Sequence, residues 1–311
     1  MSISSAFLRF SIDQEVFDFR IQCSDIEILL TGLPVLLLSM KKEPMKVALI
    51  TGASGGIGKA IADQLAGRKQ DLLLIARNEE TLREQCKMLM QCHGIIAHYI
   101  AADLSIPGTA STIVTEVTAR GLQVDMLINN AGIGSGGDFT DIPLQSELNL
   151  IQLNISSLVA LTHLLLPQMQ SRGVGTVVNI ASMTSFMPVP YMAVYAASKA
   201  FVRSFTRAIT EECKPKGVHV LLFSPGLTKT NFNASAGIDG EKAIRLGSDH
   251  NRAGNQTPEQ VAVELIEALD DRRNFAISGR RNRIGAKLMA LLPDFMIART
   301  IASSYRKGLK L

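Results

Sequence analysis

The sequence predicts an α/β protein with a doubly wound parallel sheet in a single domain. From residue 46 onward, short apolar runs that suit strands alternate with longer amphipathic stretches that suit helices. Such alternation gives a parallel sheet with helices on both faces. The runs at 72–75, 176–180 and 218–223 are predominantly apolar, as is typical of strands buried on both faces.

The expected elements follow one another in strand–helix order. We expect strands at 47–50, 72–75, 95–100, 126–128, 176–180 and 218–223, and helices at 58–66, 79–91, 109–120, 144–169, 195–213 and 258–269. No low-complexity linker or internal repeat interrupts this series, so residues 45–270 are predicted to form one domain. Within it, the polar stretch 227–256 is rich in Gly, Asn and Ala and predicts a loop or mobile lid.

Residues 1–44 do not share this pattern. The apolar run 28–38 is shorter than the roughly 20 residues of a membrane-spanning helix. Acidic residues precede it, whereas a signal peptide begins with basic ones. Because Met40 and Met45 stand just before the first clear strand, we hypothesise that the natural start is one of them. Residues 1–44 would then be a misassigned start or a weakly ordered extension.

The segment 271–311 predicts a basic amphipathic helical extension. It holds ten Lys and Arg residues against Asp271 and Asp294, with apolar residues at 288–292 and 295–297 between them. A helix of this kind packs on its own domain or a second subunit, which we favour, or it contacts a membrane surface.

Charge and cysteine content exclude several classes of function. The net charge of +4 is too modest to predict a nucleic-acid partner. Four scattered cysteines without paired spacing suit a reducing compartment and predict a cytoplasmic protein. The five histidines lack ligand spacing, so no metal site is predicted.

A glycine-rich loop follows the first expected strand. The run Thr51-Gly-Ala-Ser-Gly-Gly-Ile-Gly58 leads from that strand into a helix. Glycines in this position allow a tight turn and let a pyrophosphate approach the positive end of the helix. A dinucleotide cofactor is therefore predicted to bind Gly52, Ser54, Gly56, Ile57 and Gly58.

Tyr195 and Lys199 stand four residues apart on an expected helix and therefore project from the same face. A nearby ammonium favours the tyrosinate, so we expect Lys199 to lower the pKa of the Tyr195 phenol from about 10 toward neutrality. Tyr195 then serves as a general acid or base for a carbonyl and its alcohol. Ser182 can donate a hydrogen bond to the same oxygen.

The order of these motifs resembles that of the short-chain dehydrogenases/reductases, in their single-domain Rossmann-fold form. The resemblance covers about residues 46–269 and includes Asn129-Asn-Ala-Gly132, Tyr195-Ala-Ala-Ser-Lys199 and Pro225-Gly226. It implies that Lys199 also binds the nicotinamide ribose and that Asn154 positions a proton-relaying water. Further cofactor contacts implied by the resemblance are Asp103, Leu104, Asn130, Ala131, Gly132, Tyr195, Pro225, Gly226 and Thr230.

The end of the second strand bears on the choice of cofactor. A fold that selects NAD(H) places an acidic residue there, whereas this chain has Arg77. A guanidinium suits a 2′-phosphate, so NADP(H) is predicted over NAD(H).

The sequence is less informative about the substrate. Residues 183–194 are mostly apolar and, with Phe232, predict a hydrophobic pocket. We therefore expect hydride transfer involving the carbonyl or secondary alcohol of a ketone, aldehyde, 3-oxoacyl or steroid-like compound. The alternative is a catalytically silent dinucleotide-binding sensor or scaffold. The family resemblance also implies a homodimer or homotetramer, to which Arg203 and Phe205 could contribute.

Overall fold

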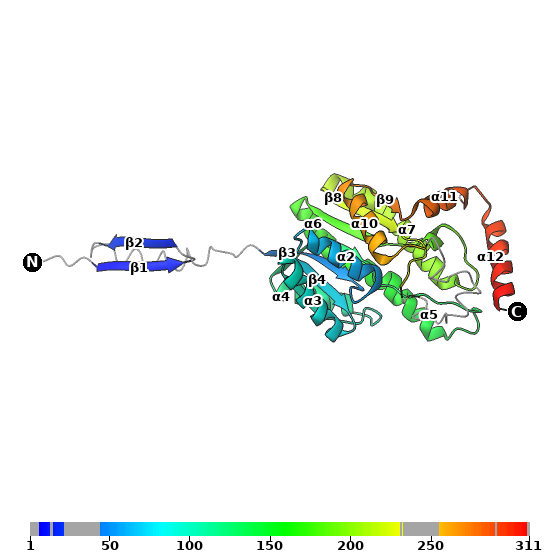
Figure 1. Ribbon diagram of the computed structural model, residues 1–311, viewed down its shortest axis with the longest axis horizontal. Coiled ribbons are helices and arrows are strands. Elements are labelled where there is room, and N and C mark those ends of the chain that lie inside the picture. Colours follow the sequence, from blue (N-terminus) through cyan, green and yellow to red (C-terminus); the bar gives the residue numbers. More distant parts are fainter. Residues whose placement is uncertain are drawn as a thin grey trace, which may run out of the picture. The chain divides into compact units, whose positions relative to one another are not determined.

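A computed structural model describes residues 6–12, 15–21, 44–230, 232, 255–289 and 291–309 (Figure 1). The chain divides into two units, Met1–Pro44 and Met45–Leu311. In the first unit, β1 (Ala6–Ile12) pairs antiparallel with β2 (Glu15–Ile21), a pair that the sequence pattern did not predict. Much of the segment 1–44, including Met40, lies outside the described residues, as do residues 231 and 233–254 of the predicted lid.

The second unit is built on a seven-stranded sheet in the order β5-β4-β3-β6-β7-β8-β9. All its neighbouring strands are parallel, which confirms the predicted doubly wound sheet. Its strands are β3 (Met45–Thr51), β4 (Leu72–Ala76), β5 (Ala97–Ala101), β6 (Leu122–Asn129), β7 (Gly175–Ile180), β8 (Val218–Ser224) and β9 (Phe275–Ile277). Because β9 belongs to the sheet, the sheet continues beyond residue 270, where the predicted domain was expected to end.

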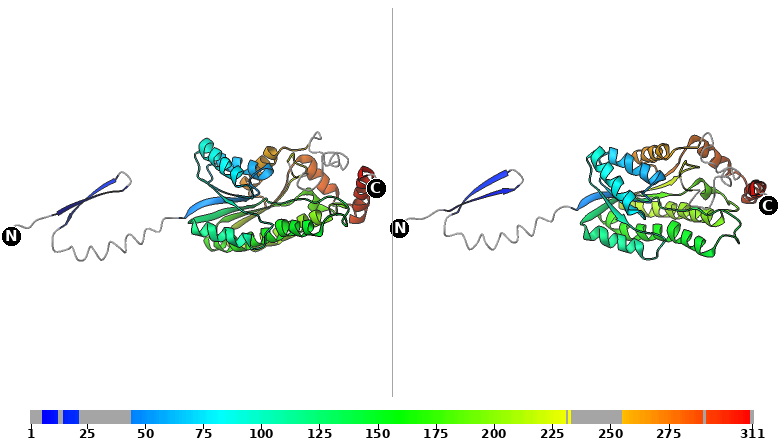
Figure 2. Two further views of the ribbon diagram at one scale, coloured as in Figure 1. Left: turned by 90° about the horizontal axis from the view of Figure 1, so that it is seen from below. Right: turned by 60° about the horizontal axis from the view of Figure 1, so that its bottom comes forward.

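Helices cover both faces of the sheet (Figure 2). The first face carries α2 (Gly56–Gly67), α3 (Glu79–His93) and α10 (Pro258–Asp270), and the second carries α4 (Thr109–Ala119), α6 (Ser157–Arg172) and α7 (Ala193–Cys213). Neighbouring residues of β4 point to opposite faces: Leu74 lies in the first core and Leu73 in the second, both fully buried. This explains why β4 reads as a continuous apolar run.

The strand β6 starts four residues earlier than expected. Leu122 and Val124 are buried, but Gln123 and Asp125 interrupt the apolar run, so the sequence signal was confined to its second half. Pairing with β3 from Met45 onward extends the strand.

The long helix predicted at 144–169 consists of three consecutive parts. These are α5 (Leu144–Ile151), a π-helical turn η1 (Gln152–Ser156) and α6. By length and composition alone, the stretch Leu144–Arg172 could cross a membrane. In the fold, α6 packs against β6 and β7 through side chains such as Leu161 and Leu165, as a core helix does.

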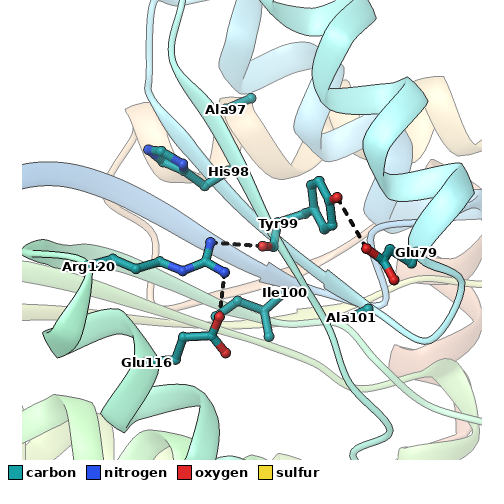
Figure 3. Close-up of a pocket in the computed structure, with 8 residues that line it drawn as sticks. All are labelled: Glu79, Ala97, His98, Tyr99, Ile100, Ala101, Glu116 and Arg120. Carbon is teal, nitrogen blue, oxygen red and sulfur yellow. Dashed lines mark hydrogen bonds and ion pairs between the residues drawn. The ribbon is translucent and has the colours of Figure 1, made fainter.

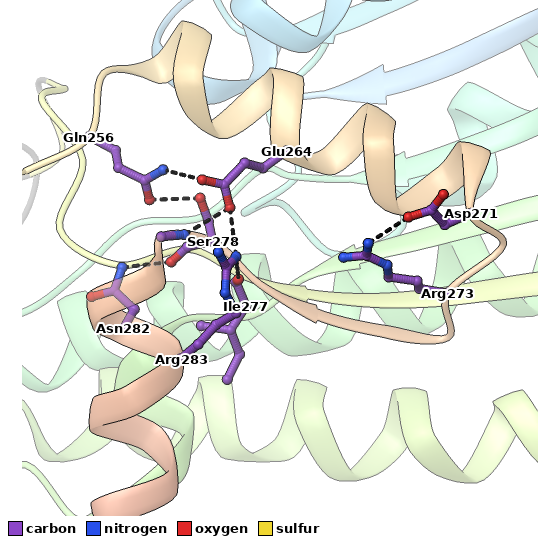
Figure 4. Close-up of polar contacts among 9 residues, drawn as sticks. Gln256, Glu264, Asp271, Arg273, Ile277, Ser278, Asn282 and Arg283 are labelled. Atoms are coloured by element: carbon purple, nitrogen blue, oxygen red, sulfur yellow. Dashed lines mark hydrogen bonds and ion pairs between the residues drawn. The ribbon is translucent and has the colours of Figure 1, made fainter.

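Two further helices, α11 (Arg280–Met289) and α12 (Asp294–Leu309), form most of the predicted extension. Polar contacts centred on Glu264 of α10 hold the start of α11 (Figure 4). The Glu264 carboxylate accepts hydrogen bonds from the Gly279 N–H at 2.8 Å and the Gln256 amide at 2.9 Å, and it pairs with Arg283 at 3.1 Å. These contacts therefore fix the first helix of the extension to the domain.

Candidate active site

The predicted site residues gather at one edge of the sheet. Six of them follow the carboxyl end of a strand within two residues; for β3 to β8 in chain order these are Gly52, Arg77, Asp103, Asn130, Ser182 and Pro225. The neighbours β3 and β6 continue into opposite halves of the sheet, so this edge contains the switch point where open α/β sheets bind ligands.

The glycine-rich loop packs against the turn after β6. A Cβ added to Gly58 would stand 2.3 Å from the Gly52 carbonyl oxygen, and one on Gly52 would stand 2.9 Å from the Ala131 Cα. Gly52 and Gly56 have φ of +66° and +52°, values that L side chains rarely adopt. These glycines are needed for close backbone packing, whereas a Cβ on Gly55 would meet nothing within 4 Å.

Thr51 connects the same two segments, and the sequence analysis did not single it out. Its hydroxyl accepts the Asn130 N–H at 3.0 Å and the Ala131 N–H at 2.9 Å. The Asn130 side-chain amide donates to the Thr51 carbonyl at 2.9 Å. Thr51 is 2% exposed, so this pairing is shielded from water.

Asn154 lies within the π-helical turn and is 1% exposed. Its Oδ1 accepts the Ile133 N–H at 3.0 Å, and its Nδ2 donates to the Ile133 carbonyl at 2.9 Å and the Ser198 hydroxyl at 3.1 Å. A Cβ on Gly132 would stand 3.1 Å from Asn154 Oδ1 and 3.4 Å from Lys199 Nζ. Asn154 and Lys199 therefore meet across Gly132, and π-helical turns often occur at such functional sites.

Ser182 lies beside Tyr195, close enough for its hydroxyl to lower the pKa of the phenol. Ser182 caps the 3₁₀ turn η2 (Met183–Phe186), where its Oγ accepts the Thr184 N–H at 3.2 Å. The side chain of Thr184, a residue that the sequence pattern did not single out, also lies close enough to Tyr195 to lower the pKa of the phenol. Two hydroxyl-bearing side chains thus adjoin the phenol.

The expected effect of Lys199 on Tyr195 is wrong for the protein without cofactor. Both side chains are buried, at 5% and 7% exposure, and burial disfavours both charged forms. Burial raises the pKa of Tyr195, an effect that the neighbouring Ser182 and Thr184 side chains only partly offset. Burial also lowers the pKa of Lys199 to about 8. Lys199 Nζ donates to the Ile180 carbonyl at 3.0 Å.

Arg77 and Asp103 lie at the ends of β4 and β5. Arg77 is exposed and follows Ala76 directly. The pKa of Asp103 is lowered although partial burial alone would raise it, because Ser105 donates two hydrogen bonds and Arg77 is nearby. The Leu104 side chain is buried in the core beside α4.

The loop after β8 is covered by α11. A Cβ on Gly226 would stand 2.1 Å from the Asn282 side chain, so a residue of the extension sits on the predicted Pro225-Gly226 motif. Thr230 faces the glycine-rich loop, since a Cβ on Gly56 would stand 3.1 Å from its methyl group.

An apolar cluster surrounds Tyr195 on its outer side. Its buried members are Leu150, Val189, Met192, Tyr195 and Ala196, and packed against them are Ile133, Met187, Val194, Phe232, Ile301 and Tyr305. The Tyr195 and Phe232 rings are 5.3 Å apart, and the Tyr305 ring stacks on Tyr191 at 5.7 Å. The sequence pattern predicted the apolar stretch 183–194 and Phe232 as part of this pocket, whereas Ile301 and Tyr305 of α12 were not predicted.

One cavity lies away from these residues. It has a volume of about 510 Å³ beside the edge strand β5, where Glu79, Tyr99, Glu116 and Arg120 contribute to its lining (Figure 3). Arg120 donates to the Tyr99 carbonyl at 3.0 Å and pairs with Glu116. None of the predicted site residues lines it.

Comparisons with known proteins identify relatives of this chain. A family model described as short chain dehydrogenase matches residues 46–240. Dehydrogenase/reductase SDR family member 7B of Xenopus laevis is 31% identical over 274 residues, which are 84% of each chain. The very-long-chain 3-oxoacyl-CoA reductase of Mus musculus is 35% identical over 189 residues, or 60% of each chain. A solved short-chain dehydrogenase from Sphingobium yanoikuyae in complex with NADPH has a TM-score of 0.70 and 30% identity, covering 79% of this chain and 92% of that one.

Proposed function

The chain belongs to the short-chain dehydrogenase family of oxidoreductases, as its motifs predicted, and on that premise we propose that it is an NADP(H)-dependent carbonyl reductase for apolar substrates. The observation that carries this proposal is the grouping of four side chains: Ser182 lies beside Tyr195, and Asn154 and Lys199 meet across Gly132. The four side chains form a compact proton-handling group at the ligand-binding edge of the sheet.

The residues of the site suit proton transfer to a carbonyl oxygen. The bound reduced nicotinamide would supply the hydride to the carbonyl carbon. Tyr195, held neutral by burial, gives its phenol proton to the oxygen as negative charge develops there. The Ser182 hydroxyl donates a second hydrogen bond and stabilises that charge. In the oxidative direction, Tyr195 in its deprotonated form accepts the proton from the alcohol, and Ser182 keeps its hydrogen bond to the substrate oxygen.

Lys199 and Asn154 would restore the proton to Tyr195. With a pKa of about 8, Lys199 can both donate and accept a proton near neutral pH. The contact of Asn154 with Gly132 and Ser198 places its amide beside the amine, where a water molecule could connect them. Lys199 would also donate to the nicotinamide ribose, as the family resemblance implies.

The ends of α2 and β4 support the choice of NADP(H). The N-terminus of α2 carries no acidic residue or side-chain cap, so its backbone N–H groups suit a pyrophosphate. Arg77 is exposed directly after β4 and would pair with a 2′-phosphate. NADPH in the Sphingobium yanoikuyae relative supports the same preference.

The apolar cluster supports a hydrophobic substrate. Met192, Phe232 and Tyr305 adjoin Tyr195 without a charged side chain among the cluster members. The related very-long-chain 3-oxoacyl-CoA reductase supports 3-oxoacyl thioesters as one class, beside ketones, aldehydes and steroid-like compounds.

The test is a substrate panel followed through the loss of NADPH or NADH absorbance. It comprises medium-chain aldehydes, apolar ketones, 3-oxoacyl thioesters and ketosteroids. Turnover that is faster with NADPH and rises with apolar size is expected. Tight NADPH binding without turnover of any compound would favour a dinucleotide-binding sensor instead.

We also propose a cytoplasmic homodimer or homotetramer. Leu144 and Leu148 of α5 are 72% and 47% exposed, and Phe201 of α7 is 40% exposed, so both helices offer apolar surface for a second copy. Sedimentation equilibrium is expected to give a multiple of the chain mass; a monomer at micromolar concentration would contradict this assembly.

A further inference from the structure

The turn between α11 and α12 and the adjoining ends of both helices expose a group of apolar side chains, which we name the apolar corner. Its six side chains are 48–79% exposed, and they are Ile284, Leu288, Leu291, Leu292, Phe295 and Met296. Leu291, in the turn itself, is the most exposed at 79%. Single exposed apolar residues are common, but a group of this size marks an interaction surface. Figures 1 and 2 show α12, in red, at the outer end of the domain.

Basic side chains flank the apolar corner on both helices. The exposed cations are Arg280, Arg281, Arg283, Lys287, Arg299 and Arg306, whereas Asp294 is the single acidic residue in the sequence 280–309. Arg283 pairs with Glu264. Among the described residues, no carboxylate forms an ion pair with the other five cations. The surface therefore combines an apolar centre with an uncompensated positive rim.

We propose that the apolar corner docks the protein on an anionic lipid surface. Apolar side chains in a helical turn can enter the boundary between headgroups and acyl chains, while flanking cations bind anionic headgroups. A second copy fits less well, because a two-fold contact would set the same cations of both copies against each other. Packing on the domain itself is already provided by Ala286 and Ile297, which are both 6% exposed.

The docked surface would adjoin the substrate site through α12. Tyr305 follows Phe295 by ten residues, a rise of about 15 Å along the helix, and Tyr305 and Ile301 pack in the cluster around Tyr195. An apolar substrate could thus pass from the bilayer to the site along this helix. This consequence rests on the proposed function, whereas lipid docking does not.

The absence of tryptophan from the sequence allows a direct test on the full chain. A Leu291→Trp variant places one fluorophore in the apolar corner. The matched control is Val174→Trp, because Val174 is 61% exposed in the loop before β7. Circular dichroism establishes that both variants fold. Vesicles of phosphatidylcholine with phosphatidylglycerol are expected to shift the emission of Leu291→Trp to the blue and to leave the control unchanged.

Co-sedimentation with the same vesicles measures the contribution of each feature. The paired change Leu291→Ser and Leu292→Ser is expected to weaken binding at least about tenfold. Removing a cation, as in Lys287→Gln, is expected to weaken it by about fivefold at low salt. No blue shift, equal binding to phosphatidylcholine alone, or an emission shift that depends on protein concentration without vesicles would overturn the proposal. The last result would identify a second copy as the occupant.

Discussion

Replacing Lys199 with Met should make the cofactor-free protein more stable while abolishing its reaction. The pKa of Lys199 falls from 10.5 to about 8 because burial disfavours the charged amine. At 1.36 kcal/mol for each pKa unit, the charge destabilises the fold by about 3 kcal/mol at pH 7. Met has a similar length and carries no charge. Subtracting about 1 kcal/mol for the lost hydrogen bond to Ile180 leaves a gain of about 2 kcal/mol.

The gain should depend on pH in a defined direction. Below pH 8, Lys199 is protonated in both folded and unfolded wild-type chains, so the full penalty is present. Between pH 8 and 10.5, the folded chain releases its proton before the unfolded chain does. Wild-type stability therefore rises with pH in this window, and the advantage of the variant disappears.

Urea unfolding without cofactor, at pH 7 and near pH 10, measures this difference. Lys87→Met is the matched control, because Lys87 is exposed on α3; it should leave stability almost unchanged at both pH values. A Lys199→Met variant less stable than wild type at pH 7 would refute the reasoning. So would a stability difference that is the same at both pH values.

Three further predictions concern the cofactor and substrate sites. Gly58→Ala places a Cβ 2.3 Å from a backbone oxygen and should lower the free energy of unfolding by about 1–3 kcal/mol. Gly55→Ala is the control, because a Cβ there meets nothing within 4 Å, and it should leave that free energy nearly unchanged. Urea unfolding measures both. Arg77→Glu should raise the KM for NADPH at least about tenfold and spare NADH; equal effects on both cofactors, or the same effect from Arg83→Glu, would argue against the 2′-phosphate contact. Tyr305→Ala should raise the KM for bulky apolar ketones without changing the Kd for NADPH; an unchanged KM would remove α12 from the substrate site.

Local patterns in the sequence predicted most of the sheet and the ends of its strands. The apolar runs at β4 and β8 are buried on both faces, so composition alone identified them. Gly52 and Ser182 were predictable because each follows an apolar run within two residues, whereas Asn130 was predicted from the family resemblance. Family membership, the parallel sheet and its flanking helices followed from the same signals.

The remaining features depend on contacts between distant segments. Asn282 lies on Gly226, and Tyr305 stacks on Tyr191, although nothing in the spacing of these residues links them. The direction of the Tyr195 pKa was mispredicted because helical spacing gives proximity but not burial. Burial arises only when the sheet edge and the apolar cluster enclose the phenol.

The most direct test of the central claim compares Tyr195→Phe with Tyr99→Phe in the reduction of an accepted apolar ketone by NADPH. Each variant removes one phenol oxygen, and Tyr99 lies on the edge strand β5, away from Ser182. The proposed role of Tyr195 predicts a fall in kcat/KM of about 10²–10⁴ for Tyr195→Phe alone, with an unchanged Kd for NADPH. Comparable turnover by both variants would contradict the assignment of Tyr195 as the proton donor.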